Sequence, residues 1–462
     1  MSAPRFGIVS YAAHLPRYRL ARTEIGAALN TSAGRGDRVV ASFDEDSTTL
    51  AVAAARAALA AAGTRVPVPE SLHFATTTPA YADKANATAI HAALGLPETV
   101  FAADLAGSAR SGVAALRATA ATGGLAVLAD VIVGRPGSSD ESGGGDAAAA
   151  FVFGPSEDAA AEIVGAASFT EEFLDRWRAP GSAAGERWEE RFGFGRYAPL
   201  VERAVAHSLS DAGIDQADHV VVVSGNTAVT KRAASLVQAG KSTGGSLIGY
   251  AGAATAGVAL ADALDRAQPG ETILLVSAVD GADALVLRAT EKIADHRQAI
   301  PVTEQVAAGR AVTYPTYLTW RGLLDREPPR RPEPDRVSGP AAARGRAWKF
   351  SLTGSRCRDC GFVHLPPARV CKGCGAVDRM VAEPLAGRAG SVATYTVDRL
   401  AFSPAPPVVD AVVDFTDGGR YTFEVADADP EALAVGTQVE TVFRRLNTAG
   451  GVQNYFWKVR VL

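Results

Sequence analysis

Cysteine is absent from most of this chain, since all four cysteines lie between residues 357 and 374 of 462. The preceding residues therefore hold no thiol that could form a disulfide or act as a nucleophile. Long apolar runs are also missing, because the longest aliphatic stretches fall far short of the ~20 residues needed to cross a bilayer. The amino-terminal segment carries charges where a signal peptide would be apolar. We expect a cytoplasmic protein that does not enter membranes.

The chain also lacks an excess of charge of either sign, with 46 Lys and Arg residues against 50 Asp and Glu residues. Nucleic-acid binding depends chiefly on clustered Lys and Arg that neutralise phosphates, so this balance gives no reason to expect it. Hydrophobic residues make up 47% of the composition, which excludes disorder as the dominant state. The length allows roughly two to four folded domains.

Short β-branched segments alternate with Ala-rich segments of helical length in the first part of the chain. The strand-like segments include residues 6–10 and 73–77, and the helix-like segments include residues 47–62 and 84–94. This alternation predicts an α/β fold with a largely parallel, buried sheet. Ser47 or Thr48 is expected to cap the start of the first of these helices, and Gly63 to follow its end.

Two segments resemble each other: GSARSGVAAL at residues 107–116 and GAATAGVALA at residues 252–261. Each is followed by a glycine and then by a strand-like run, at residues 125–129 and 272–277. This order predicts a duplicated core with two similar halves. The small residues at both helix starts predict close approach of the backbone, either to the other helix or to a ligand.

The composition changes in the carboxyl-terminal part of the chain. Residues 325–346 contain four prolines before Val337 together with many charges, which is typical of a linker. Five strand-like segments between residues 387 and 462, separated by turn residues, predict a small β-barrel of OB type.

Two CxxC pairs stand between the linker and these strands, and a glycine follows each pair. Four thiolates at this spacing can close a tetrahedral zinc site, and the glycines allow the turns that point backbone N–H groups at sulfur. A closed site has no position for a reactive water, so we expect structural zinc rather than a redox dithiol. The four expected ligands are Cys357, Cys360, Cys371 and Cys374.

Several motifs in the first 290 residues resemble the thiolase superfamily, specifically its 3-hydroxy-3-methylglutaryl-CoA synthase branch. They are GIVSY at 7–11, LPRYR at 15–19, YADK at 81–84, the segment 104–116, GDAAAA at 145–150, FTEEFLDRW at 169–177 and Ile248-Gly249. Residues 317–462 resemble the zinc-ribbon and OB-fold proteins that accompany such enzymes.

The resemblance implies a duplicated thiolase fold with αβαβα layers, followed by a rubredoxin-like zinc ribbon and a small OB-type barrel. The implied domains are a thiolase-like domain at 1–290 with halves of about 1–155 and 156–290, a helical and Pro-rich linker at 291–345, a ribbon at 346–384 and a barrel at 385–462.

In that branch a Cys takes the acyl group, a Glu moves the proton of the second substrate, and a His and an Asn position the condensing partner. Matching the motifs places Ala109 at the Cys, Thr77 at the Glu, Val223 at the His and Tyr250 at the Asn, so all four are replaced. Ser108 precedes the first of these positions by one residue. One step along a helix turns a side chain by about 100°, so we expect its hydroxyl to point elsewhere.

The resemblance suggests other groups for catalysis. Tyr250 places a phenol where it can act as a general acid or base without a covalent bond, and its alternative role is that of a packed core residue. Asp280 and Asp283 match the loop that borders the family's pocket. There the resemblance implies a base or a group that binds a polar substrate, and the alternative role of each carboxylate is to cap a helix or a turn.

Substrate contacts are expected from Thr77 and Ala109. Ser224 and Asn226 follow an apolar strand and are further candidates for the pocket, with a role as turn residues as the alternative. Coenzyme A or a carrier-protein phosphopantetheine needs cations near its phosphates. The candidates for binding these phosphates are Arg110, Arg232 and Lys241. The alternative for each is a solvated charge on the protein surface.

The sequence thus predicts a cysteine-independent enzyme acting at a carbon–carbon bond of an acyl thioester, in an aldol or retro-aldol type of reaction. The alternative is a catalytically silent scaffold that binds acyl-CoA and channels substrate to a partner thiolase. The resemblance also implies a homodimer formed through the thiolase-like domain and, as a further partner, a thiolase or a carrier protein.

Overall fold

The computed structural model describes residues 6–32, 34–66, 68–237, 243–244 and 246–462. The chain divides into two compact units. The first contains Met1–Ala41, Asp46–Thr88 and Pro97–Tyr317, and the second contains Ser42–Glu45, Ala89–Leu96 and Leu318–Leu462. Within the described ranges, no helix has both the length and the apolar character needed to cross a membrane.

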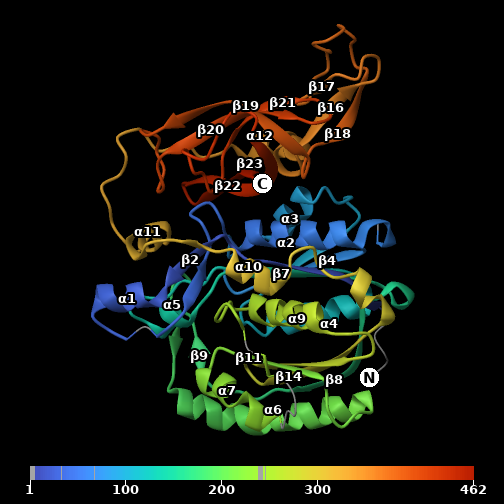
Figure 1. Cartoon of the computed structure of the whole chain (residues 1–462), viewed down its shortest axis with the longest axis vertical. Helices are drawn as coiled ribbons and strands as arrows, with labels where there is room; N and C mark the ends of the chain where they lie inside the picture. Colours follow the sequence, from blue (N-terminus) through green and yellow to red (C-terminus); the bar gives the residue numbers. More distant parts are fainter. Residues whose placement is uncertain (1–5, 33, 67, 238–242, 245) are drawn as a thin grey trace. The chain divides into compact units, whose positions relative to one another are not determined.

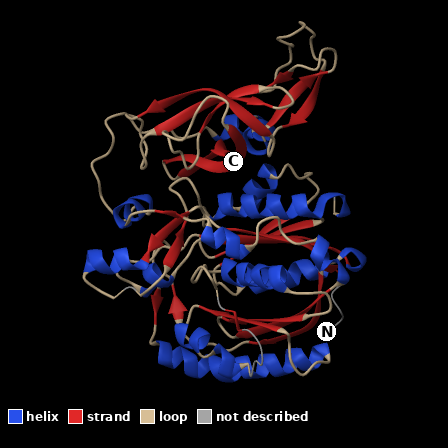
Figure 2. Cartoon of the chain, viewed as in Figure 1, coloured by secondary structure: helices blue, strands red, loops and turns tan. Residues whose placement is uncertain are grey.

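The first unit has five layers, with helices outside and between two halves of a sheet (Figures 1 and 2). The halves have the strand orders β5-β4-β6-β7-β1 and β8-β14-β13-β11-β12, and β1 pairs with β8 only at Ile8 and Ala161. The first half consists of β1 (Phe6–His14), β4 (Ser71–Thr76), β5 (Phe101–Ala106), β6 (Gly124–Asp130) and β7 (Ala147–Pro155). The second consists of β8 (Ala161–Phe169), β11 (His219–Ser224), β12 (Thr243–Gly244), β13 (Thr272–Ala278) and β14 (Ala282–Ala289).

Helices cover the sheet halves in the order expected of the αβαβα fold. Helix α2 (Ser47–Ala62) packs on β1, β6 and β7, and α6 (Glu190–Ala212) packs on β8 and β14. Helices α4 (Ser111–Thr122) and α9 (Ala254–Arg266) lie between the halves. The fold class expected from the sequence is therefore confirmed for this unit.

The expectation of a largely parallel sheet is only partly correct. Strand β4 is parallel to β5 and β6, and β11 is parallel to β12 and β13. The pairs β6–β7, β1–β7, β13–β14 and β8–β14 are antiparallel. A parallel pair needs a crossover of about a dozen residues or more, whereas a three-residue loop joins β13 to β14. The longer connection from β6 to β7 contains the short helix α5 (Ser139–Gly143).

Helix α2 has the bounds that the sequence predicts, but a different residue caps it. Asp46, one place before the two hydroxyl residues expected as caps, accepts a hydrogen bond from the backbone N–H of Thr49 at 2.9 Å. The Thr49 hydroxyl receives the Asp46 backbone N–H at 2.8 Å, which completes a capping box. Gly63 ends the helix with a positive φ of 57°, as expected.

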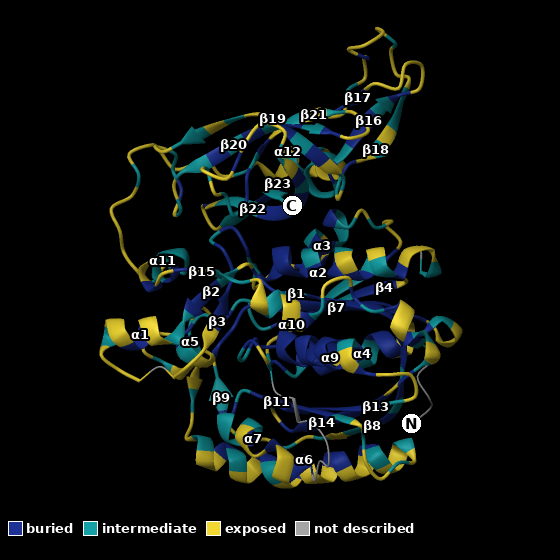
Figure 3. Ribbon diagram, in the orientation of Figure 1, coloured by how far each residue is buried: buried dark blue, intermediate teal, exposed yellow. Residues whose placement is uncertain are grey.

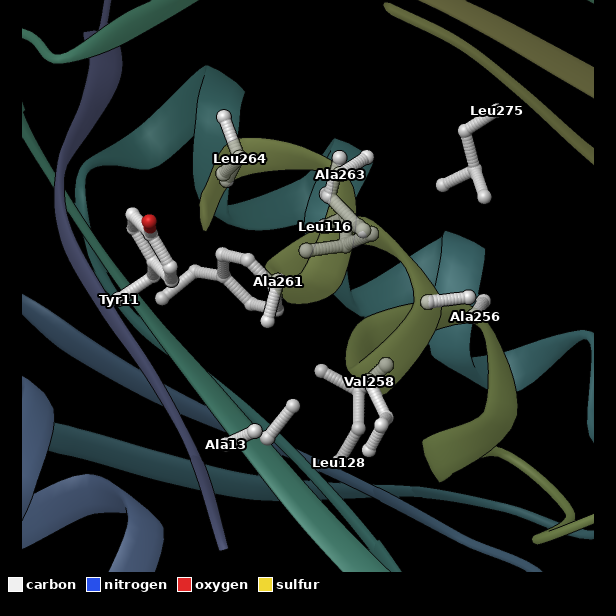
Figure 4. Close-up of a cluster of buried hydrophobic side chains, with 14 of the residues drawn as sticks. Tyr11, Ala13, Leu116, Leu128, Ala256, Val258, Ala261, Ala263, Leu264 and Leu275 are labelled. Atoms are coloured by element: carbon white, nitrogen blue, oxygen red, sulfur yellow. The ribbon is translucent and has the colours of Figure 1, made fainter. Parts of the chain in front are cut away.

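The two repeated segments form α4 and α9, and their small residues let the helix starts approach each other. A Cβ at Gly112 would lie 2.4 Å from the carbonyl oxygen of Ala253, so only glycine fits there. Figure 4 shows part of the core around α9, where Leu128 of the first half lies beside Val258, and where Leu116 and Leu264 belong to the same buried cluster. Both central helices are more deeply buried than the outer helix α6 (Figure 3). Close approach of one helix to the other is thus confirmed.

The second unit contains the zinc ribbon and the barrel. Five strands form the barrel sheet in the order β21-β20-β19-β22-β23, and a parallel bridge between Val425 and Val459 connects its two edges. This arrangement agrees with the OB type expected from the five strand-like segments. The elements are α12 (Gly339–Arg344), α13 (Arg346–Ser351), β16 (Thr353–Cys357), β17 (Val363–His364), β18 (Met380–Pro384), β19 (Ala389–Asp398), β20 (Val408–Phe415), β21 (Arg420–Glu424), β22 (Gln438–Ala449) and β23 (Val452–Val461).

Shorter elements complete the chain. They are β2 (Tyr18–Ala21), α1 (Arg22–Leu29), β3 (Asp37–Val40), α3 (Ala87–Ala93), β9 (Arg176–Trp177), β10 (Glu186–Arg187), α7 (Thr227–Lys231), α8 (Ala233–Leu236), α10 (Val302–Ala307), β15 (Arg310–Ala311) and α11 (Tyr314–Trp320).

Candidate functional site

A cavity of about 310 Å³ lies in the first unit, at the carboxyl ends of parallel strands from both sheet halves. Thr77 follows β4, Gly225 follows β11, and Ala278 ends β13, and all three line the cavity. Open α/β sheets place ligands at such strand ends, and this volume is at the small end of the range for small-molecule pockets, ~300–1,000 Å³. We treat this cavity as the candidate active site.

Three of the four positions matched to the family's catalytic residues meet at this cavity. Thr77, Ala109 and Tyr250 line it, although the three are far apart in sequence. Val223 is buried inside β11 and is not among the lining residues.

Tyr250 is held by its backbone and by a cation over its ring. Its N–H donates to the carbonyl of Gly143 at 2.9 Å, and its carbonyl accepts the N–H of Gly145 at 3.1 Å. The guanidinium carbon of Arg176 lies 5.3 Å from the ring centroid. Burial raises the pKa of the Tyr250 phenol to about 12, and Arg176 opposes this rise. The hydroxyl therefore stays protonated at neutral pH and is a hydrogen-bond donor toward the cavity.

Arg176 is fixed by a bidentate ion pair with Asp140, with N–O distances of 2.6 and 2.7 Å. Burial tends to lower the pKa of Arg176, but the hydrogen bonds and charge of Asp140 hold it above its usual value. The Arg176 guanidinium over the Tyr250 ring therefore stays charged whether or not a ligand is bound.

Asp175, next to Arg176, also lines the cavity. Its Oδ1 accepts a hydrogen bond from Asn226 Nδ2 at 3.3 Å. Burial raises the pKa of the Asp175 carboxyl, while the hydrogen bonds from Asn226 and Tyr197 oppose the rise. The structure thus places a carboxyl group, a guanidinium group and two phenols around one small volume.

Asp280 lies in the loop between β13 and β14 and lines the same cavity. Its φ of 50° is in the left-handed region, which a non-glycine residue rarely adopts. Its Oδ2 accepts a hydrogen bond from the Ser108 hydroxyl, and its carbonyl oxygen accepts one from Arg110 Nη1 at 2.8 Å. Two of the three catalytic candidates predicted from sequence, Tyr250 and Asp280, therefore line one cavity.

Asp283 lies instead at a second cavity of about 760 Å³ and is only 4% exposed. Its carboxylate forms a bidentate pair with Arg110, at 2.8 and 3.1 Å, and accepts the Ser168 hydroxyl at 2.6 Å. Arg110, a candidate for binding phosphates, is thus occupied by a partner within the unit. The pair joins the residue before α4 to strand β14, so Asp283 lies in this strand rather than in the loop where the sequence placed it.

Asp130, the last residue of β6, is fully buried beside the cavity wall. Its Oδ1 accepts the backbone N–H groups of Thr77 at 2.7 Å and Thr78 at 2.9 Å, and the hydroxyls of Thr76 and Thr78. Its Oδ2 accepts the N–H of Ala253 at 2.6 Å. Burial raises the pKa of this carboxyl, and the hydrogen bonds oppose the rise. One side chain thus connects a strand end of the first half to the loop after Tyr250.

Three further candidates, Ser224, Asn226 and Arg232, do not line the cavity. Ser224 donates to the carbonyl of Ala278 at 2.7 Å. Asn226 caps α7 through the N–H of Ala228 at 3.0 Å, and so combines its turn role with holding Asp175. The guanidinium carbon of Arg232 lies 4.4 Å from the ring centroid of Phe194. Lys241 lies outside the described residues.

Sequence reasoning missed Asp175, Arg176 and Tyr197 as cavity residues. The first two fall within FTEEFLDRW at residues 169–177, which was noted only for its resemblance. The available signal was the adjacent acidic and basic pair Asp175-Arg176 beside Trp177.

The four cysteines of the ribbon converge as their spacing predicts, with sulfur atoms all within 4.8 Å of one another. The Sγ–Sγ distances are 3.8 Å for Cys357–Cys374 and 3.5 Å for Cys360–Cys371. Zn–S bonds of ~2.3 Å in a tetrahedron require sulfurs about 3.8 Å apart, so the donors fit zinc. The glycines after the two pairs, at 361 and 375, have φ of 76° and 78° and donate to Cys357 and Cys371 carbonyls at 3.0 Å.

Comparisons with known proteins agree with both units. Residues 350–378 match a family model described as the rubredoxin-like zinc ribbon domain of ChsH2, and residues 382–444 match its C-terminal OB-fold domain. A DUF35 domain-containing scaffold protein of Methanocaldococcus jannaschii is 34% identical over 125 residues, which cover 25% of this chain and 88% of that protein.

The remaining part of the chain has relatives of another kind. A solved HMG-CoA synthase complexed with CoA superposes with a TM-score of 0.56 over 68% of this chain and 89% of its own, at 15% identity, and thus shares the fold. The hydroxymethylglutaryl-CoA synthase of Methanopyrus kandleri is 31% identical over 354 residues, which cover 69% of this chain and 98% of that protein. The chain therefore belongs to the hydroxymethylglutaryl-CoA synthase family, and it carries a zinc ribbon and an OB-fold domain in the same polypeptide.

Proposed function

We propose that this protein catalyses an aldol or retro-aldol type of reaction at a carbon–carbon bond of an acyl thioester, without an acyl-cysteine intermediate. The observation that carries the proposal is the shared cavity of Tyr250 and Asp280, where Ala109 occupies the position matched to the nucleophilic cysteine. A phenol and a carboxylate are the donor and the base that such a reaction needs.

The pKa of Tyr250 supports the division of roles that we propose. With a pKa of about 12, only ~10⁻⁵ of the phenol is ionised at pH 7, so Tyr250 is present almost entirely in the protonated form, which can donate a proton but cannot accept one as a base. In the condensing direction the Asp280 carboxylate removes a proton from the carbon next to the thioester carbonyl. The resulting enolate carbon attacks a second carbonyl, and Tyr250 gives its proton to the oxygen of that carbonyl as the new bond forms.

Coenzyme A or a phosphopantetheine is the proposed carrier of the acyl group. A solved structure with this fold is of an HMG-CoA synthase complexed with CoA, which supports this choice. Arg232 and Lys241 stay predictions as phosphate ligands. Arg110 has a better supported role in holding Asp283 and the Asp280 loop.

A second candidate function is a scaffold that binds acyl-CoA and passes it to a partner thiolase or carrier protein. The match of the carboxyl-terminal unit to a protein named as a scaffold favours this alternative. The two functions differ in one measurable property, because a scaffold binds acyl-CoA without changing it.

The test is a panel of acyl-CoAs incubated with the zinc-loaded chain, with and without iodoacetamide, followed by mass spectrometry of the small molecules. We expect a change in mass of at least one acyl-CoA, and the same rate after iodoacetamide, since the only thiolates are zinc ligands. Inactivation by iodoacetamide would contradict the cysteine-independent mechanism. Tight binding without conversion, also in the presence of added thiolases, would support the scaffold instead.

We further propose that the first unit forms a homodimer. Strand β5 ends the sheet order with β4 as its one paired strand within the described ranges, and Phe101 on this strand is 62% exposed. An unpaired strand edge with an exposed aromatic side chain is suited to pairing with a second copy. Sedimentation velocity at micromolar protein should show a dimer, and a single monomeric species would contradict this expectation.

A further inference from the structure

We propose that Ser108 is the nucleophile that accepts the acyl group, with the Asp280 carboxylate as its base. The inference rests on the proposed function only in taking a thioester as the acyl donor. A serine nucleophile would give the site a covalent step although Ala109 stands at the position matched to the family's cysteine. It would also give a role to a hydroxyl that was expected, from the sequence, to point away from the site.

The position of the helix start explains why that expectation was wrong. Helix α4 begins at Ser111, so Ser108 and Ala109 precede the helix and lie in a turn closed by the Ser111 N–H on the Ser108 carbonyl at 3.0 Å. The step of about 100° per residue applies within a helix and does not apply to this turn. Both residues line the same cavity of about 310 Å³.

The hydrogen bonds of Ser108 suit a nucleophile. Its hydroxyl donates to Asp280 Oδ2, and its Oγ accepts the backbone N–H of Arg110 at 3.2 Å. A hydroxyl oxygen has two lone pairs, so one remains available for attack. The carboxylate removes the proton, and the N–H group stabilises the negative charge that develops on Oγ.

Asp280 is held in place through its backbone by Arg110, which is itself paired with Asp283. Its positive φ of 50° is a strained conformation for a residue with a Cβ. Arg110 maintains that conformation through the hydrogen bond from Nη1 to the Asp280 carbonyl, while Asp283 fixes the same guanidinium. Backbone strain of this kind is concentrated at functional sites.

The step balances without another reactant. Ser108 Oγ bonds to the thioester carbonyl carbon while its proton passes to Asp280 Oδ2. The carbon–sulfur bond then breaks, and the departing thiolate takes the proton from Asp280. The products are an acyl ester of Ser108 and a free thiol, and Asp280 is again ionised for the enolate step.

The test uses two reagents on the full zinc-loaded chain: a fluorophosphonate, which phosphonylates activated serines with loss of fluoride, and the acyl-CoA panel with acid quenching. Intact-mass measurement should show one adduct per chain with the fluorophosphonate and with at least one acyl-CoA, and peptide mapping should place it on Ser108. Ser108→Ala should abolish the adduct, and Asp280→Asn should slow its formation about 10²- to 10⁴-fold.

Ser111→Ala is the matched control. Ser111 lies three residues away, and its buried hydroxyl has no hydrogen-bond partner in the described part of the chain, so its loss should leave labelling at the wild-type rate. Tyr250→Phe should also keep the acyl adduct, because the phenol acts after acylation.

Three results would overturn the assignment. The first two are the absence of an adduct with either reagent and an adduct that persists in Ser108→Ala. The third is conversion of an acyl-CoA at the wild-type rate by Ser108→Ala, which would leave the proposed function intact. Labelling of Ser108 without any carbon–carbon bond change would support the nucleophile and count against the proposed function, so the two failures are distinguishable.

Discussion

Replacing Tyr250 by phenylalanine should lower turnover of the acyl thioester about 10²- to 10⁴-fold, or ~3 to 5 kcal/mol of activation free energy. Phenylalanine keeps the ring that lies against Arg176, so the loss can be assigned to the hydroxyl rather than to a cavity. Because the hydroxyl donates to an oxygen that becomes negative during the reaction, the loss should fall on kcat more than on KM.

The pH dependence gives an independent check on the same residue. The protonated phenol is the active form, so on the alkaline side the rate should fall only as the pH rises through the phenol's pKa of about 12. Turnover should therefore show no loss around pH 10, where a tyrosine of ordinary pKa would be half ionised. A decline around pH 10 that disappears in Tyr250→Phe would show an unperturbed phenol and contradict the environment described.

A matched control is Tyr395→Phe, which removes a phenol hydroxyl from β19 of the barrel and should leave turnover unchanged. Full activity in Tyr250→Phe itself would remove this residue from the mechanism. Asp280 would then be tested next by Asp280→Asn, and after it Asp283.

The second large effect is expected at the ribbon. Cys360→Ser should reduce the zinc content from about one ion per chain to well below one, because the site needs four thiolates to saturate the tetrahedron. Structural zinc contributes ~10 to 16 kcal/mol of apparent binding free energy to small metal domains, so its loss should unfold the ribbon. Metal analysis measures the first effect, and limited proteolysis within residues 353–384 measures the second.

Lys372→Ser is the control for this experiment, since Lys372 lies exposed between Cys371 and Cys374 and is not a ligand. It should keep normal zinc content and resistance to protease. Normal zinc in Cys360→Ser, or a wild-type chain with little zinc, would contradict a structural four-cysteine site. Zinc with an open position for water would be revealed if removing the metal abolished catalytic activity while the ribbon stayed folded.

The zinc site could be predicted from sequence because its geometry is local. Each CxxC pair fixes two sulfurs on one turn, and the glycines at 361 and 375 supply the positive φ that those turns require. The two central helices were likewise predictable, because small residues such as Gly112 in a repeat indicate close backbone approach.

The cavity was predictable only in part. Thr77, Ala109 and Tyr250 were found through resemblance, which already contains tertiary information about which strand ends meet. Asp175 and Arg176 lie at and just before the two-residue strand β9, which is too short to show a sequence periodicity, and only folding brings them to the cavity. Ser108 was misjudged because a helix boundary decides where a side chain points, and such boundaries are the least certain part of a sequence-based assignment.

The carboxylate of Asp130 also has a consequence for binding affinity. One oxygen fixes the backbone of Thr77, and the other fixes Ala253, three residues after Tyr250. The segments that carry Thr77 and Tyr250, which form two walls of the cavity, are thus ordered together before any ligand binds. A ligand that enters the cavity meets preformed walls, so little conformational entropy is lost there on association, and more of the contact energy remains as net affinity.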